Sequence, residues 1–219
     1  MSEHYPKDHE KIFDTPNPST AFGVYRPASG GPVPRSPGGP AWNRVQKRTL
    51  SAGACLTMVA KWMKCEMRGP VFRFDQLGPT GALHIAHARY KMDETDHMKT
   101  ERPFEIFGLK KTLMQVVEND EELGDFLTWF YEFVPGEKIY MRMDMWAGGG
   151  GHTVGFIIEP GEPGNGKYLE PNTGAWEFKS YKRAKMALSD VIWEAWQASE
   201  ARVGEGGERT FYFSDVEAE

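Results

Sequence analysis

The sequence has few cysteines and none of the spacings that usually mark structural sulfur chemistry. Cys55 and Cys65 are its two cysteines, and on one helix their Cα atoms would lie about 15 Å apart, at ~1.5 Å per residue. A disulfide needs Cα atoms within about 7 Å, so the two cannot pair with each other. No CxxC pair is present, which argues against a thiolate zinc site. We therefore expect a protein of a reducing compartment.

Clusters of positive charge and targeting segments are scarce as well. The net charge is −5 and no basic run exceeds NRVQKR, so no nucleic-acid partner is predicted. No apolar run approaches the ~20 residues that cross a bilayer, so no membrane span is expected. The polar start MSEHYPKDHEKIF lacks the apolar core of a cleavable secretory signal.

Residues 1–50 differ in composition from the rest of the chain. They concentrate proline, glycine and serine, as in TPNPSTAFGVYRPASGGPVPRSPGGPAW. A segment of this kind is predicted to form an extended or partly disordered arm. We expect the folded domain to cover residues 51–219.

Two hydrophobic periods divide that domain. Helical spacing in SAGACLTMVAKWMKCEM places Cys55 in the first turn of a helix. Further helices are predicted in GALHIAHARYKM, PFEIFGLKKTLMQVVEND and EELGDFLTWFYEF. Alternation then predicts strands in KIYMRMDMW, HTVGFIIE, KYLEP and AWEFKS, a helix over about 182–201, and a last strand in RTFYFSD. Helices followed by an antiparallel sheet are typical of the α+β class.

Cys55 and His152 suit nucleophilic catalysis. A thiol in the first turn of a helix lies near its partial positive charge, which favours the thiolate; the alternative is a small buried hydrophobe. His152 follows four glycines and shares a strand face with Val154 and Phe156. It is either a core histidine with a polar partner or the base beside a cleft whose wall is bare glycine.

Glu170 and Asn172 lie two residues apart in YLEPNTGAWEF and project to the same side if the segment is extended. If this strand pairs with the His152 strand, one of them can accept the imidazole Nδ1–H and leave Nε2 for the thiol, as in a catalytic triad. The alternative is a simple turn, because EPNTG is favourable turn chemistry.

The order Cys, His and Asx/Glx is that of papain-like cysteine hydrolases. The patches CLTMVAKW, GHTVGFII and LEPNTGAWEF resemble the YopT-type cysteine proteases of bacterial effectors. The resemblance implies a papain-like α+β fold, an N-terminal helical part packed on a C-terminal antiparallel sheet, with Cys55 as nucleophile and His152 as base. The family carries Asp where this chain has Glu170, so either Glu170 or Asn172 would orient His152. Gln46 is a candidate for the oxyanion hole.

The function that follows is a cysteine protease acting on a protein substrate without a cofactor or metal. As implied by the family, it would be a virulence effector that is made in a bacterial cytoplasm, delivered without a signal peptide, and able to process its own N-terminal arm. A deamidase, transglutaminase or acyltransferase with the same residues stays open, as does a catalytically weakened binding module on the same fold. LHIAH, with His84 and His87 near His97, lacks the companion ligands of a zinc site and is interpreted as surface histidines.

Overall fold

The computed structural model describes residues 10–13, 55–69, 102–134, 136–147, 150–161, 165–171, 174–204 and 207–219. The sequence predictions for GALHIAHARYKM, Gln46, His84, His87, His97 and Asn172 lie outside these residues. The contacts divide the chain into two compact units. The first consists of Met1–Ile12, Thr112–Leu169 and Trp176–Val216; the second consists of Phe13–Lys111, Glu170–Ala175 and Glu217–Glu219.

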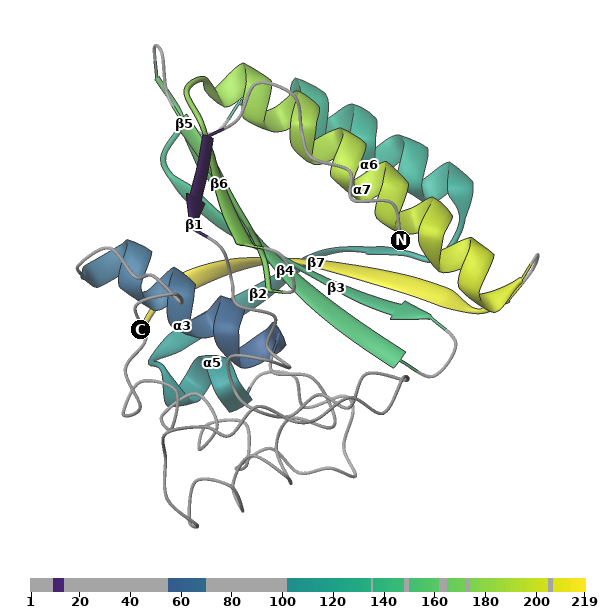
Figure 1. Cartoon of the computed structure of the whole chain (residues 1–219), viewed down its shortest axis with the longest axis horizontal. Helices are drawn as coiled ribbons and strands as arrows, with labels where there is room; N and C mark the ends of the chain where they lie inside the picture. Colours follow the sequence, from purple (N-terminus) through teal and green to yellow (C-terminus); the bar gives the residue numbers. More distant parts are fainter. Residues whose placement is uncertain are drawn as a thin grey trace, which may run out of the picture. The chain divides into compact units, whose positions relative to one another are not determined.

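The described strands form one seven-stranded sheet in the order β1-β6-β5-β4-β3-β7-β2 (Figure 1). Their bounds are β1 Glu10–Phe13, β2 Leu109–Val117, β3 Ile139–Ala147, β4 Gly150–Glu159, β5 Asn165–Glu170, β6 Gly174–Phe178 and β7 Arg209–Ala218. The strand β3 pairs antiparallel with both β4 and β7, and β4 pairs antiparallel with β5. β3 and β4 are thus inner strands of the sheet, with neighbours on both sides.

The first unit buries one face of the sheet under two helices, α6 (Asp120–Glu132) and α7 (Tyr181–Val203), which lie side by side in Figure 1. Met141 and Met143 project from β3 into this core, as the alternation in KIYMRMDMW predicts. Aromatic rings fill the space between the layers. Phe126 of α6 stacks on Phe213 at 3.8 Å between ring centroids, and Trp196 of α7 meets Phe211 edge-on at 5.1 Å.

The start of α6 is joined to its neighbours by polar contacts. The Asn119 side chain caps the helix by accepting a hydrogen bond from the backbone N–H of Glu122 at 3.0 Å. One carboxylate oxygen of Asp120 accepts from the indole N–H of Trp196 at 2.7 Å and from Arg209 of β7 at 2.8 Å. The guanidinium of Arg209 also lies 4.0 Å from the ring centroid of Trp196. Helix, helix and strand therefore meet at one carboxylate.

The end of α6 is capped from α7. The buried ammonium of Lys185 donates hydrogen bonds to the backbone carbonyls of Tyr131 and Phe133, the latter at 2.5 Å. The last carbonyls of a helix have no partner within it, so a cation there satisfies them and complements the helix dipole. Burial lowers the pKa of Lys185, while the charge of Glu132 acts in the opposite direction.

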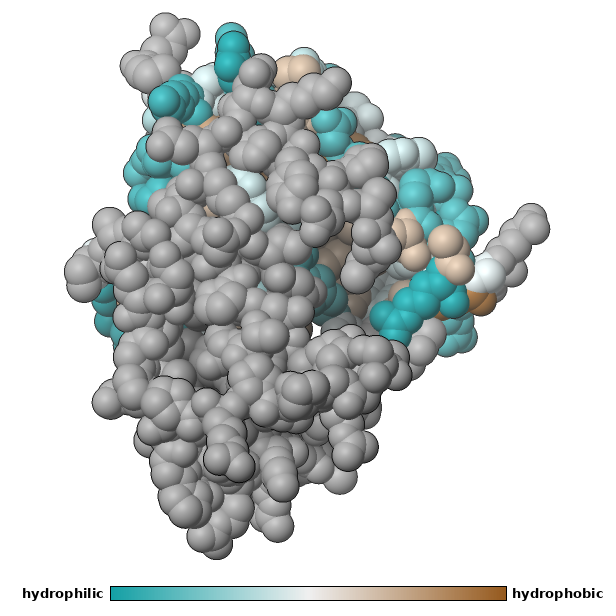
Figure 2. Space-filling view, in the orientation of Figure 1, coloured by the Kyte–Doolittle hydropathy of each residue, from teal (hydrophilic) through white to brown (hydrophobic). Residues whose placement is uncertain are grey.

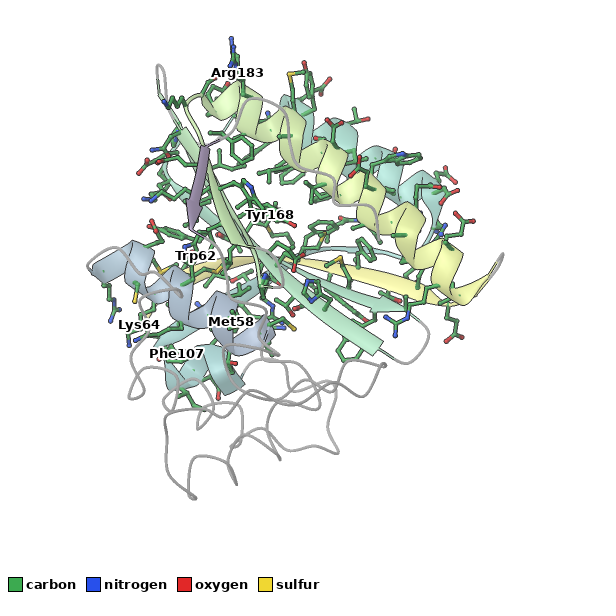
Figure 3. The ribbon with its side chains drawn as sticks, in the orientation of Figure 1. Met58, Trp62, Lys64, Phe107, Tyr168 and Arg183 are labelled. Carbon is green, nitrogen blue, oxygen red and sulfur yellow. The ribbon has the colours of Figure 1, made fainter. Side chains whose placement is uncertain are left out.

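The second unit contains α3 (Cys55–Arg68) and the short helix α5 (Arg102–Ile106), which contact each other. Met58 and Trp62 are one turn apart on α3 and fully buried, whereas Lys64 projects away from them (Figure 3). The ammonium of Lys61 lies 5.7 Å from the ring centroid of Phe107. The buried stripe of α3 thus faces the protein interior, and Lys61 and Lys64 lie at its partly exposed positions.

The α+β prediction is confirmed, with a helix early in the chain and an antiparallel sheet after it. The predicted helix in PFEIFGLKKTLMQVVEND is wrong after Ile106. Gly108 adopts a φ of 64°, a left-handed conformation suited to glycine, and its N–H bonds to the carbonyl of Glu105 at 2.8 Å. The chain leaves the helix there and continues as β2, in which Thr112 and the final Val116-Val117 pair favour strand.

The coloured surface over α6 and α7 is mostly hydrophilic, with single paler or brown residues among the teal ones (Figure 2). The exposed large hydrophobic side chains of these two helices include Tyr131, Met186 and Trp193. No helix among the described residues is both long enough and apolar enough to cross a membrane.

Replacing Lys185 with methionine should lower the free energy of unfolding by about 2 kcal/mol, because two charge-assisted hydrogen bonds to the end of α6 are lost. The exposed Lys182 of the same helix provides the matched control, and Lys182→Met should change stability by less than about 0.5 kcal/mol. Urea unfolding followed by tryptophan fluorescence measures both. Equal midpoints for the two variants would contradict the capping role.

Candidate active site

Cys55 is the first residue of α3 and is half-buried. The residues that follow it directly, from Leu56 to Val59, are buried and anchor the start of the helix. The first four backbone N–H groups of a helix have no partner within it. Cys55 therefore lies where both the helix dipole and these N–H groups favour negative charge, in agreement with its predicted place in the first turn.

Cys65 has a different environment, three residues before the end of the same helix. Burial raises the pKa of the Cys65 thiol, and the charge of Glu66 raises it further. The positive charges of Lys61 and Lys64 act against this rise. A thiol with a raised pKa is mostly protonated near neutral pH and is a poor nucleophile. The chain thus carries its own internal reference for the reactivity of Cys55.

His152 lies near the start of β4, opposite Met145 of β3. It follows Gly150 and Gly151, so it is the first residue of the strand with a side chain. Alternation places it on the face of Val154 and Phe156, which belong to the core beneath α6 and α7. His152 itself is only partly buried. The ring therefore lies at the margin of the core face, near the glycine end of the β3–β4 hairpin.

The glycine before His152 is explained by a tryptophan. Gly151 pairs with Trp146 of β3, and a Cβ atom on Gly151 would lie 3.1 Å from three carbon atoms of the Trp146 ring. Such a distance is tighter than nine in ten normal contacts of a Cβ atom, so the indole would have to move by a few tenths of an ångström. At this position the sequence suggested a bare glycine wall, whereas the space that a side chain would use is occupied by the indole.

A buried polar network that the sequence analysis did not single out lies on the other face of the same hairpin. The Arg142 Nε donates to Asp144 Oδ2 at 2.6 Å, and Arg142 Nη2 bonds to the same oxygen. The Thr153 hydroxyl donates to Asp144 Oδ1 at 2.7 Å. The exposed fractions are 0% for Arg142, 4% for Asp144 and 5% for Thr153. The signal that could have found the network is the charged pair at alternate positions of KIYMRMDMW.

Glu170 is the last residue of β5 and is half-buried. Alternation places its side chain on the same face of β5 as Tyr168. The ring of Tyr168 stacks on Phe156 of β4, with 5.3 Å between centroids. Cys55 and Glu170 belong to the second unit and His152 to the first, so the three-residue site stays a prediction, as does the role of Asn172.

Among the residues that the structure describes, no group of three or more histidine, cysteine, aspartate or glutamate side chains is arranged to hold a metal ion. The charged groups that do converge there, such as Arg142 with Asp144 and Arg209 with Asp120, are ion pairs.

Cys55 should react faster with iodoacetamide than Cys65. At pH 7.5 we expect a ratio of at least about tenfold, because the helix N-terminus favours the thiolate of Cys55 whereas burial disfavours that of Cys65. Mass spectrometry of tryptic peptides after timed alkylation gives both rates. Cys55→Ser and Cys65→Ser each remove one signal and check the assignment. Equal rates would contradict an activated Cys55.

No family model and no curated protein matches this sequence. Several solved structures resemble the chain at low sequence identity, and two of them are the following. The Pseudomonas avirulence protein AvrPphB is 14% identical with a TM-score of 0.46, over 74% of this chain and 91% of that chain. PatoxP, a cysteine protease-like domain of the Photorhabdus asymbiotica toxin PaTox, is 12% identical with a TM-score of 0.35, over 80% of this chain and 51% of that chain.

Proposed function

We propose that this protein is a papain-like cysteine protease of the YopT type that cleaves a protein substrate. The observation that carries the proposal is the position of Cys55 at the first residue of α3, half-buried and ahead of a fully buried helical stripe. A rigid, well-packed helix presents the sulfur at its positive end. That is the arrangement in which a thiol serves as a nucleophile at neutral pH.

The proposed reaction has an acylation half and a hydrolysis half, each with two proton transfers. His152 accepts the thiol proton, and the Cys55 sulfur forms a bond to the carbonyl carbon of the scissile peptide. Collapse of the tetrahedral intermediate breaks the C–N bond, and His152 returns the proton to the departing amine. Water then attacks the thioester carbonyl while His152 accepts a proton from it. The C–S bond breaks, the acid is released, and His152 returns the proton to the Cys55 sulfur. The backbone N–H groups at the start of α3 are suited to stabilise the oxyanion.

The third residue in this proposal is Glu170 or Asn172, which accepts the Nδ1–H of His152 and leaves Nε2 for the thiol. Glu170 is the last residue of β5, half-buried and on the face of Tyr168. Asn172 would share that face if the segment stays extended, so variants at both positions are needed to choose between them. The longer side chain of glutamate, compared with the family's aspartate, moves the carboxylate by more than about 1 Å, so the strand must compensate for the difference.

The wider biological role is proposed from the same resemblance. The protein would be an effector or toxin, made in a bacterial cytoplasm and delivered by a route without a signal peptide, and its substrate would be a protein of the target cell. Self-cleavage would take place in the proline- and glycine-rich arm of residues 1–50. The chemistry requires no cofactor.

An electrophilic probe tests the catalytic pair. A peptidyl epoxide should label Cys55 alone, and His152→Ala should slow the labelling at least about 100-fold, the size of a typical general-base contribution. Met145→Ala, which changes the residue opposite His152, is the control for local packing and should keep most of the rate. Labelling of His152→Ala at the wild-type rate would contradict the proposal.

Time-dependent fragments from the purified wild-type chain, absent from Cys55→Ala, would identify proteolysis, and a gain of about 1 Da on a substrate would indicate deamidation.

Variants at 170 and 172 identify the orienting residue. We expect Glu170→Ala to lower the labelling rate by about tenfold or more, because an imidazole without its partner adopts the wrong tautomer. Glu177→Ala on β6 is a matched carboxylate control and should leave the rate unchanged. If Asn172→Ala is impaired and Glu170→Ala is not, the amide is the orienting group. If neither variant is impaired, neither Glu170 nor Asn172 orients the His152 ring.

A further inference from the structure

The hairpin of β3 and β4 has few side chains that define its register at the end where His152 lies. Gly150 and Gly151 pair with Ala147 and Trp146, and they contribute no side chains of their own. Glycine-rich strands are prone to slippage, and a shift of one residue moves every side chain to the opposite face. Such a shift would take His152 from the Met145 face to the face of Asp144. Further along the hairpin, the buried pair Met143 and Val154 favours one register. At the glycine end, a polar contact beside His152 can add to that preference.

Thr153 provides that interaction, directly after His152. It lies opposite Asp144 in the pairing of the two strands, and its hydroxyl donates to Asp144 Oδ1 at 2.7 Å. The bond crosses the two strands on the face opposite His152. The same hydrogen bond cannot form in a shifted register, because Thr153 would then lie on the other face of the sheet.

Arg142 makes the bond directional. It is fully buried and donates through Nε at 2.6 Å, and also through Nη2, to the other carboxylate oxygen, Asp144 Oδ2. The carboxylate is thereby held with Oδ1 toward Thr153. Loss of the Thr153 hydroxyl would leave a buried carboxylate oxygen short of a donor, which is unfavourable in a site with so little solvent.

We propose that Asp144, oriented by Arg142, is a positioning residue that fixes the β3–β4 register through Thr153 and so keeps His152 on the Met145 face. The role of His152 in this inference rests on the proposed protease function. The effect of Asp144 and Thr153 on the β3–β4 register does not rest on that function, because it concerns only the pairing of the two strands. We call this effect the register lock. Asp144 acts through Thr153 and has no contact with the reacting atoms.

The experiment compares Thr153→Val, which keeps the shape and removes the hydroxyl, with Thr153→Ser, which keeps the hydroxyl and removes the methyl group. Thr210→Val on the neighbouring strand β7, opposite Trp146, is the control for a threonine outside the network. Thr153→Ala is a second hydroxyl-free variant in case Thr153→Val does not fold. NMR measures amide exchange at 152–154 and the cross-strand backbone proton contacts between Met145 and His152. Probe labelling of Cys55 across pH 5–9 gives the functional readout.

We expect Thr153→Val to speed exchange at 152–154 about tenfold and to weaken the Met145–His152 contacts, while the Met141–Phe156 contacts persist. The pH profile of Cys55 labelling should move toward that of His152→Ala. Thr153→Ser should retain the wild-type behaviour, and Thr210→Val should change none of these readouts.

The inference is overturned if Thr153→Val keeps both the exchange protection and the Met145–His152 contacts, or if Thr153→Ser loses them as fully as Thr153→Val does, because shape would then set the register. The NMR readouts separate this result from the protease proposal. A register that depends on the hydroxyl in a chain whose Cys55 never reacts would support the lock and remove the catalytic proposal. If Cys55 is reactive but Thr153→Val leaves the register and the pH profile unchanged, the catalytic proposal is supported and the role of Asp144 and Thr153 in the register is removed.

Discussion

The buried ion pair of Arg142 and Asp144 is the constraint around which the sheet is organised. A guanidinium without solvent requires a partner of opposite charge, because the alternative is the desolvation of a lone charge. Arg142 lies in β3, with β4 on one side and β7 on the other. Through the hydrogen bond from Thr153 to Asp144, the pair favours one register of β3 and β4 over shifted ones, although an apolar pair of similar volume could equally fill the space. Its contribution is specificity of pairing more than stability.

The two faces of β3 and β4 carry different kinds of side chains. One face carries methionine, valine and aromatic side chains under α6 and α7, and His152 lies at its margin. The other face carries the charged network and the indole of Trp146 over Gly151. The polar residues that favour one strand register thus lie on the face opposite His152, the residue proposed to transfer protons.

Much of this was accessible from the sequence because it depends on local periods. The helix from Cys55, the strand of alternating methionines and the position of His152 on a core face all follow from spacing between near neighbours. β2 was mistaken for helix because LKKTLMQVV has a mixed pattern, and the left-handed Gly108 that ends α5 carries no distinct periodic signal. The Arg142–Asp144 pair was missed because alternation assigns charged residues to solvent. The relation of Cys55 to His152 depends on contacts between residues about a hundred positions apart, which no local pattern encodes.

The cap on α6 has a consequence for the order in which the molecule assembles. Lys185 reaches the carbonyl of Phe133 from 52 positions further along the chain, so carbonyls at the end of α6 receive their donor from α7 and not from the local sequence. Until α7 has docked, that end is expected to fray, since the terminal carbonyls have only water as a partner. The two helices should therefore open and close together as one cooperative unit. During synthesis, the end of α6 would become stable only after α7 has been made.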